Sequence, residues 1–175
     1  ENNVIMFLVI FVIENRFVQG IRDGVPIALG YLSVSFAFGM MAASQGLPLW
    51  ASVVISFTNL TSAGQFAALG IIASAGSMLE MALSQLIINL RYFLMSLSLT
   101  QKVDPKMNTL QRAVIAHGVT DEIFAVSTSR YEGVGFTYMI ALMMLPILGW
   151  TGGTFLGGAA SSLLPLALRD ALGIM

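Results

Sequence analysis

The sequence predicts an all-α protein, built as a polytopic bundle of transmembrane helices with broken or re-entrant segments. Of its 175 residues, 57% are hydrophobic and only 10% are charged, and the mean hydropathy is +0.84. A soluble domain with a charged surface is hard to build from this composition. The apolar residues come in helix-length blocks instead of alternating ten-residue segments, which argues against an outer-membrane barrel.

The composition also excludes several functions. The net charge is −1, and no basic cluster is long enough to follow a phosphate backbone, so nucleic acid is not an expected partner. The chain has no Cys, which removes disulfides, thiolate metal sites and a Cys nucleophile. His117 is the one histidine and offers with Asp121 only two metal ligands, which is too few. We expect no metal, no cofactor and no enzymatic activity.

The chain begins with a lead-in over residues 1–19, predicted to be interfacial or disordered. Its apolar run over 4–13 is too short to span a bilayer. The transmembrane transporter domain is predicted over 20–175, and its first span covers about 24–43. Pro26 lies near the first turn of that span, where the missing N–H of proline would have no partner in any case.

The second apolar segment, 47–76, is the one around which the others are arranged. A straight helix of this length would measure roughly 45 Å, against a bilayer core of about 30 Å. Its middle, 58–65, is polar and contains Gly. Such an interruption at membrane depth must lie inside protein or line a wet cavity, and transporters build substrate sites from broken helices of this kind. The alternative is one tilted helix whose small residues pack against neighbours.

The third span, 78–100, carries Arg91 near its middle. An unpaired cation at that depth costs at least about 2.5 to 3.5 kcal/mol. Two stripes of polar residues run along this helix, the second at heptad spacing: Gln85, Asn89, Tyr92 and Ser96 in one, and Ser84, Arg91 and Ser98 in the other. This helix cannot face lipid on all sides.

The fourth span, 112–128, is short and holds two further intramembrane charges, Asp121 and Glu122. Adjacent residues on a helix point about 100° apart, so at most one carboxylate faces Arg91 directly. We expect one carboxylate to pair with Arg91 and the other, desolvated, to exchange a proton during transport. The alternative is that both only pair, with Arg91 and with the polar stripes.

The fifth span, 136–166, carries Gly149, Gly153 and Gly157 at four-residue spacing. This small-residue ridge predicts helix packing; the alternative is a second helix break over 146–153. The order of plain and interrupted spans is typical of inverted repeats that meet at a binding site. On that pattern, a C-terminal helix or helices would be missing after Met175.

The basic loop residues indicate how the broken segment crosses. If 47–76 crosses once, the basic residues are split between both sides. If it re-enters, every basic loop residue except Arg130 falls on the N-terminal side. Because cytoplasmic loops are enriched in Lys and Arg, we expect a re-entrant or doubly crossing segment and a cytoplasmic N-terminus.

The predicted site combines the polar interruption with the intramembrane charges. Substrate binding is assigned to one set of polar residues and Gly: Asn59, Thr61, Ser62, Gly64, Gln65 and Asn89. The charge pair and proton coupling are assigned to Arg91, Asp121 and Glu122.

Four motifs, in the same order, resemble the AzlC family, the large subunits of bacterial branched-chain amino acid exporters. They are GIRDGVPIALGY over 20–31, AGQFA over 63–67, NLRY over 89–92 and GVTDE over 118–122. The resemblance runs from Gly20 to about Ser161. It implies a multi-pass permease of the bacterial inner membrane that exports Leu, Ile and Val, with Met as a further candidate. It also implies a small AzlD-type membrane partner and coupling to the proton gradient.

Two functions are therefore kept open. The first is an export permease subunit for branched-chain amino acids. The second is a non-transporting membrane scaffold that binds a small helical partner, with 149–161 as its important surface and with charges that only fix helix packing. Asp121→Asn or Glu122→Gln should abolish export under the first hypothesis and change little under the second.

Overall fold

The computed structural model describes residues 2–131 and 133–163, which form seven α-helices and contain no strand. The predicted all-α fold is confirmed. In chain order the helices are α1 (Asn2–Ser44), α2 (Leu49–Thr58), α3 (Ser62–Ala73), α4 (Met78–Leu99), α5 (Thr109–Gly118), α6 (Asp121–Ser129) and α7 (Phe136–Leu163). Three segments of the described chain are long and apolar enough to cross a bilayer: Asn15–Ser44 in α1, all of α4, and Phe136–Ser161 in α7.

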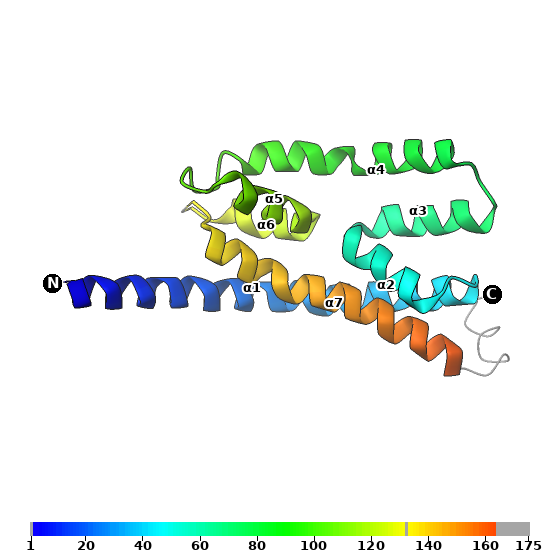
Figure 1. Ribbon diagram of the computed structural model, residues 1–175, viewed down its shortest axis with the longest axis horizontal. Coiled ribbons are helices and arrows are strands. Elements are labelled where there is room, and N and C mark those ends of the chain that lie inside the picture. Colours follow the sequence, from blue (N-terminus) through cyan, green and yellow to red (C-terminus); the bar gives the residue numbers. More distant parts are fainter. Residues whose placement is uncertain (1, 132, 164–175) are drawn as a thin grey trace.

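The four short helices form two hairpins that enter the bundle from opposite ends (Figure 1). α2 starts where α1 ends and runs inward, and α3 returns to the same end. α4 leads to the other end, where α5 runs inward and α6 returns, and α7 then runs beside α1. Both hairpins are therefore re-entrant, and they point in opposite directions as in an inverted repeat.

α1 and α7 form a frame against which both hairpins pack. Glycines let the two backbones approach closely. A Cβ atom added to Gly153 would lie 2.6 Å from the carbonyl oxygen of Leu32, and one added to Gly157 would collide with that of Phe36. Gly149 meets α1 in the same way. The small-residue ridge thus lies against α1, within the chain.

Each hairpin is anchored by its own apolar cluster. Leu69 of α3 packs with Phe38 of α1 in the smaller cluster. Ile115 of α5 and Ile123 of α6 pack with Leu142 of α7 in the larger one. Because apolar burial is non-directional and roughly proportional to area, these clusters hold the hairpins without using their polar tips.

The predicted interruption of 47–76 is confirmed, and the single tilted helix is wrong. α2 ends at Thr58 and α3 begins at Ser62, so the break is shorter than the polar stretch 58–65. Thr61 is the N-cap of α3, and its side-chain oxygen accepts a hydrogen bond from the N–H of Gly64 at 3.4 Å. The break therefore ends at a standard helix start.

The prediction of one continuous span over 112–128 is wrong. α5 ends at Gly118, and α6 begins at Asp121 with Thr120 as its N-cap residue. The physical reason is that residues typical of a helix end are followed, inside this segment, by residues typical of a helix start. Gly is common at helix ends, and Thr followed by two acidic residues is typical of a helix N-terminus.

Two further expectations concern the long helices. α7 continues through Pro146, so a second break over 146–153 is wrong. α1 is helical from Asn2 onward, so the backbone of 2–19 is continuous with the first span. Its interfacial position and a domain boundary after residue 19 stay predictions. The predicted end of the fifth span at residue 166, and Met175, lie outside the described residues.

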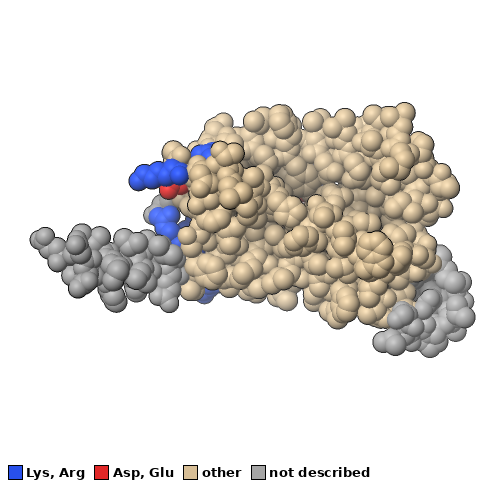
Figure 2. Space-filling model, in the orientation of Figure 1, with Lys and Arg blue, Asp and Glu red and all other residues tan. Residues whose placement is uncertain are grey.

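Charged side chains gather at one end of the face drawn in Figure 2. This is the end of the α5/α6 hairpin, where Lys102 Nζ donates to the carbonyl oxygen of Arg130 at 3.2 Å and Arg130 lies 3.4 Å from Asp23 of α1. Placing Arg130 opposite the other basic loop residues is therefore wrong. That prediction assumed a single crossing over 112–128, whereas the segment re-enters.

Candidate functional site

The two hairpin tips meet in the middle of the bundle. The ring of Phe57, near the end of α2, lies against His117 of α5, with centroids 5.8 Å apart. Asn89, near the middle of the α4 span, borders the same place. A pocket of about 150 Å³ lies here, lined by both breaks and by α4: Thr58, Asn59, Leu60, Thr61, Asn89, Tyr92, Ala116, His117 and Val119. The tips therefore lie near the bilayer centre.

Side-chain amides hold the first hairpin together. Gln65 is fully buried, and its Nε2 donates to the carbonyl oxygen of Asn59 at 2.8 Å and to Ser56 Oγ at 3.2 Å. From α4, Gln85 Nε2 donates to the carbonyl oxygen of Gly64 at 2.8 Å. These bonds satisfy a carbonyl group in the helix break and tie α3 to α4.

One hydrogen-bond acceptor of Asn89 is unpaired among the described residues. Its Nδ2 donates to Gln85 Oε1 at 3.2 Å, whereas its Oδ1 is buried and has no hydrogen-bond partner among the described residues. Gln65 Oε1 is in the same state. Since buried polar atoms are nearly always satisfied, a water molecule or a donor group of a ligand in the small pocket would complete Asn89.

The tip of the second hairpin carries an ion pair. Arg91 Nη1 lies 2.7 Å from Asp121 Oδ2, and the two side chains are 46% and 44% exposed. Arg91 Nη2 also donates to the hydroxyl of Tyr92 at 3.3 Å. The pairing offsets the cost of an arginine at this depth, and the N-terminal end of α6 further favours the carboxylate.

Glu122, the second carboxylate, has a different partner. The hydroxyl of Tyr31 on α1 donates a hydrogen bond to Glu122 and lies 2.6 Å from Thr120 Oγ1. The ring of Tyr31 packs edge-on against Trp150 of α7, with centroids 5.1 Å apart. Asp121 and Glu122 thus have separate surroundings, as adjacent residues on one helix should.

A larger pocket, of about 330 Å³, lies on the Glu122 side of the tips. Residues from α1, α3, α6 and α7 line it: Pro26, Ile27, Gly30, Tyr31, Val34, Ser62, Glu122 and Trp150. Small-molecule sites begin at about 300 Å³, so this pocket has the size of a site for a small metabolite. The pocket at Asn89 is less than half as large.

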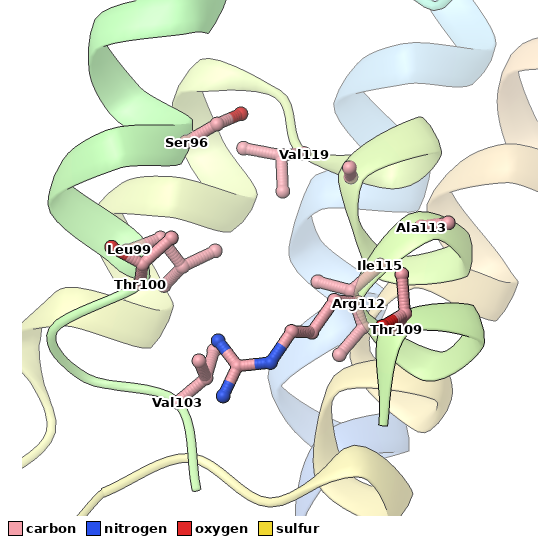
Figure 3. A pocket seen from close by; sticks show the side chains of 10 residues that line it. Ser96, Leu99, Thr100, Val103, Thr109, Arg112, Ala113, Ile115 and Val119 are labelled. Carbon is pink, nitrogen blue, oxygen red and sulfur yellow. The ribbon is translucent and has the colours of Figure 1, made fainter. Parts of the chain in front are cut away.

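A third pocket, also of about 330 Å³, lies between α4 and α5 at the charged end (Figure 3). Leu99, Val103 and Ile115 give it apolar walls, and Figure 3 shows the Arg112 side chain extending across it. Arg112 Nε donates to the carbonyl oxygen of Met107 at 3.1 Å. Since none of its lining residues has a carboxylate, this pocket has no counter-ion for an ammonium group.

A clasp at the charged end ties the second hairpin to both frame helices. The hydroxyl of Tyr138 on α7 donates to Asp23 Oδ2 on α1 at 2.7 Å. Arg130, which follows α6, lies 3.4 Å from the same oxygen and 4.2 Å above the ring of Tyr138. It also donates to Gln19 Oε1 at 3.1 Å. The outer end of the hairpin is thereby fixed, while its tip borders the two pockets at Asn89 and Glu122.

The residues predicted from the sequence fall into four groups. Asn59, Thr61 and Asn89 line the small pocket, and Ser62 lines the larger one. Gly64 and Gln65 take part in contacts that hold the first hairpin. Arg91, Asp121 and Glu122 lie at the second tip, and Gly149, Gly153 and Gly157 lie against α1. Their functional roles stay predictions.

Sequence reasoning missed Tyr31, Thr120 and Trp150. A signal was present for the two aromatic residues, because Tyr and Trp are enriched at membrane interfaces and these two lie near the middle of their spans. An aromatic residue with a polar atom at that depth indicates a partner or a cavity. Thr120 is the N-cap residue of α6, and the Thr-Asp-Glu sequence is the signal that could have identified it.

Three spanning helices with two re-entrant hairpins, whose polar and charged tips meet at mid-depth, define a helical membrane protein of the transporter type. The chain belongs to the AzlC family: the family model described as AzlC protein matches residues 26–164. No solved structure matches this chain.

Two relatives illustrate the family. The chain is 30% identical over 166 residues to the inner membrane protein YgaZ of Escherichia coli, an alignment that covers 91% of this chain and 68% of YgaZ. It is 31% identical over 150 residues to an uncharacterized membrane protein of Archaeoglobus fulgidus, covering 86% of this chain and 65% of that protein. The chain thus spans about two thirds of the length of the curated relatives it matches.

Proposed function

We propose that the chain forms the substrate site of a permease subunit that exports branched-chain amino acids in exchange for protons. Leu, Ile and Val are the expected substrates, with Met as a further candidate. The observation that carries the proposal is the meeting of two oppositely directed re-entrant tips at mid-depth. One tip is neutral, and the other carries Asp121 paired with Arg91 beside Glu122 bonded to a tyrosine.

The chemistry of the tips suits a zwitterion with an apolar side chain. The N-terminal ends of α3 and α6 favour negative charge, and a carboxylate can hold an ammonium group. The larger pocket adds Ile27 and Val34 as apolar walls. One methylene changes binding in such a pocket by only about 1 to 3 kcal/mol, so several branched side chains should be accepted.

The contacts between the hairpins favour alternating access. Among the described residues, no hydrogen bond or ion pair joins the α2/α3 hairpin directly to the α5/α6 hairpin; Phe57 and His117 meet only through their rings. Each hairpin is instead bonded to the spanning helices. Separation of the tips therefore breaks few directional contacts, which is what rocking of one repeat against the other requires.

The charge distribution supports a cytoplasmic N-terminus. The end with the α5/α6 hairpin carries Lys102 and Arg130, whereas the described connections at the other end, 45–48 and 74–77, contain no charged residue. Positive residues are enriched on the cytoplasmic side. The proposed location is the bacterial inner membrane.

A small AzlD-type membrane subunit is the proposed partner. α4 packs along one side only and leaves large apolar residues such as Leu86, Ile87 and Phe93 at least 60% exposed, a surface that lipid or such a subunit would cover. The scaffold hypothesis needs the ridge over 149–161 as its docking surface. Since Gly149, Gly153 and Gly157 face α1, that surface is already in use.

Efflux of labelled leucine and valine tests the proposed function. Bacteria without their own exporter would express this chain alone and then with the small subunit, at two external pH values. We expect efflux that depends on the subunit and on pH and that is lost in Glu122→Gln. Glu80→Gln, in the first turn of α4, is the matched control and should leave efflux unchanged. A chain that inserts and binds its partner but never exports either amino acid would refute the proposal.

A further inference from the structure

The larger pocket, on the Glu122 side of the hairpin tips, brings together the groups that would bind an ammonium ion with an apolar tail. Its volume is about 330 Å³, and Glu122 is its one acidic lining residue. The rings of Tyr31 and Trp150 stand beside this carboxylate, and aromatic faces attract cations. Ile27 and Val34 supply apolar wall. Ser62, the first residue of α3, also borders the pocket, where the helix end favours a negative group.

Glu122 forms no ion pair with a cationic side chain of the described residues. Among the described residues, the ion pair nearest to it in sequence is Arg91 with Asp121 at 2.7 Å, and no Lys, Arg or His forms an ion pair with Glu122 itself. Since the neighbouring arginine is already paired, the carboxylate can be neutralised in two ways. It can take up a proton, or it can hold an external cation.

The hydrogen bonds around Tyr31 fit two protonation states of Glu122. A tyrosine hydroxyl has one proton, yet Tyr31 contacts both Glu122 and Thr120. When Glu122 is ionised, Tyr31 donates to it and Thr120 donates to Tyr31. When Glu122 is protonated, it donates to Tyr31, which then donates to Thr120. The three groups stay hydrogen-bonded to one another in both states, so a proton can arrive at Glu122 or leave it without breaking the contact with Tyr31.

We propose that Glu122 is the common binding group for the ammonium of the substrate and for the exchanged proton. Resting on the proposed function, this assigns the substrate to the larger pocket and not to the one at Asn59 and Asn89. The amino acid would place its ammonium at Glu122, its carboxylate at the start of α3 and its side chain between Ile27 and Val34. When the ammonium binds, the carboxyl proton passes to water; when the amino acid leaves, one proton returns. Exchange of one substrate for one proton follows from mutual exclusion.

The other titratable groups near Glu122 are few. α1 contributes Tyr31, α4 contributes Arg91 and Tyr92, α5 contributes His117 at the opposite pocket, and α6 contributes Asp121. α3 has no titratable residue, and in the described part of α7 Tyr138 lies at the clasp. With Asp121 tied to Arg91, a pH response of the larger pocket is assigned to Glu122.

Equilibrium binding to the full chain in lipid nanodiscs tests the proposal with three probes. Leucine has both charged groups, 3-methylbutylamine lacks the carboxylate, and 4-methylpentanoate lacks the ammonium. We expect leucine and the amine to bind, and their affinity to fall by up to about tenfold per pH unit once Glu122 protonates. Binding of 4-methylpentanoate should show no such fall.

Glu122→Gln should weaken binding of the amine at least tenfold and remove its pH dependence, whereas Glu80→Gln should match the parent. The chain has two Trp residues, and Trp50 lies at the start of α2 and is 71% exposed. A Trp50→Phe background therefore leaves Trp150 as the reporter of the pocket. Its emission should respond to leucine and to the amine, and it also shows whether the Glu122→Gln variant is folded.

Two failures are distinguishable. If leucine binds the parent and Glu122→Gln equally at both pH values, the assignment to Glu122 is wrong while the permease function stands. If leucine neither binds nor is exported, the proposed function fails as well. Should Glu122→Gln not fold, Tyr31→Phe replaces it: amine binding should persist, but the pH at which it weakens should change. An unchanged pH profile in Tyr31→Phe would overturn the proposal.

Discussion

The two re-entrant hairpins share a backbone plan and differ in the chemistry of their tips. Each consists of two short helices with a break of two or three residues, and each second helix starts after a buried threonine, Thr61 or Thr120. The first hairpin is closed by neutral amides, with Gln65 bonded to the carbonyl oxygen of Asn59. The second presents Asp121 and Glu122. The first tip is thus neutral and held by amide hydrogen bonds, whereas the second carries two carboxylates.

The difference follows from what each break needs. A helix break at membrane depth must satisfy its freed backbone groups, and an amide with donors and acceptors can do so in one protonation state. A carboxylate at a helix N-terminus is also stabilised by the helix end, but it adds a charge that needs a partner. Among the described residues Glu122 has the tyrosine hydroxyl as its side-chain partner and forms no ion pair, which is the basis of the proposed proton exchange.

The largest effect should come from splitting the ion pair of the second tip. Arg91→Gln leaves Asp121 unpaired, and we expect the free energy of unfolding in mixed micelles to fall by up to about 3 kcal/mol. The double variant Arg91→Gln with Asp121→Asn should recover most of that loss. If the double variant is no more stable than the single one, the pair does not stabilise the tip.

Adding one methyl group where α1 and α7 pack should lower the free energy of unfolding nearly as much as splitting the ion pair. A Cβ atom at Gly157 collides with the carbonyl oxygen of Phe36, whereas one at Gly152 meets nothing within 4 Å. Gly157→Ala should therefore cost about 2 kcal/mol by overpacking, and Gly152→Ala should be neutral or slightly stabilising. Thermal unfolding of the two variants makes this comparison, and equal midpoints would contradict the close packing of α1 and α7.

The first hairpin should lose stability without changing its response to pH. Gln65→Met removes the donor to the carbonyl oxygen of Asn59 and leaves that oxygen unsatisfied, at about 1.5 kcal/mol. Leucine affinity measured across pH should keep the shape of the parent profile. A shifted pH profile would mean that the two tips are not chemically separate.

The smallest effect is expected at the clasp. Tyr138→Phe removes the hydrogen bond to Asp23 Oδ2 but keeps the ring under Arg130, so the loss should be about 1 kcal/mol or less. Efflux should be close to that of the parent chain. A strong loss of efflux would indicate that this end of the hairpin moves during transport.

The same hairpins explain how far sequence reasoning reached. The break within 47–76 was predictable because Asn59 and Thr61 interrupt an otherwise apolar run. The second break was harder to see because polar residues are scattered along 112–128 and Val119 in the break is apolar. The charges Arg91, Asp121 and Glu122 were recognisable one by one from their cost in lipid.

The partners of those charges were not predictable. Tyr31 and Glu122 are 91 positions apart and meet only because α6 turns back toward α1. The choice of Asp121 for Arg91 likewise depends on the direction in which α6 re-enters. Gln65 is predicted to bind substrate, and this stays a prediction, because a polar residue in a helix break can serve the substrate or the backbone. That its Nε2 bonds the carbonyl oxygen of Asn59 was not predictable from the sequence.

Cysteine accessibility tests the central claim, that the two hairpins re-enter from opposite sides. The chain has no native Cys, so single variants carry no background. Gln45→Cys and Ala75→Cys flank the first hairpin, and Asn108→Cys and Tyr131→Cys flank the second. An impermeant thiol reagent should label the first two from one face of the membrane and the last two from the other. Labelling of Gln45→Cys and Ala75→Cys from opposite faces would contradict the account.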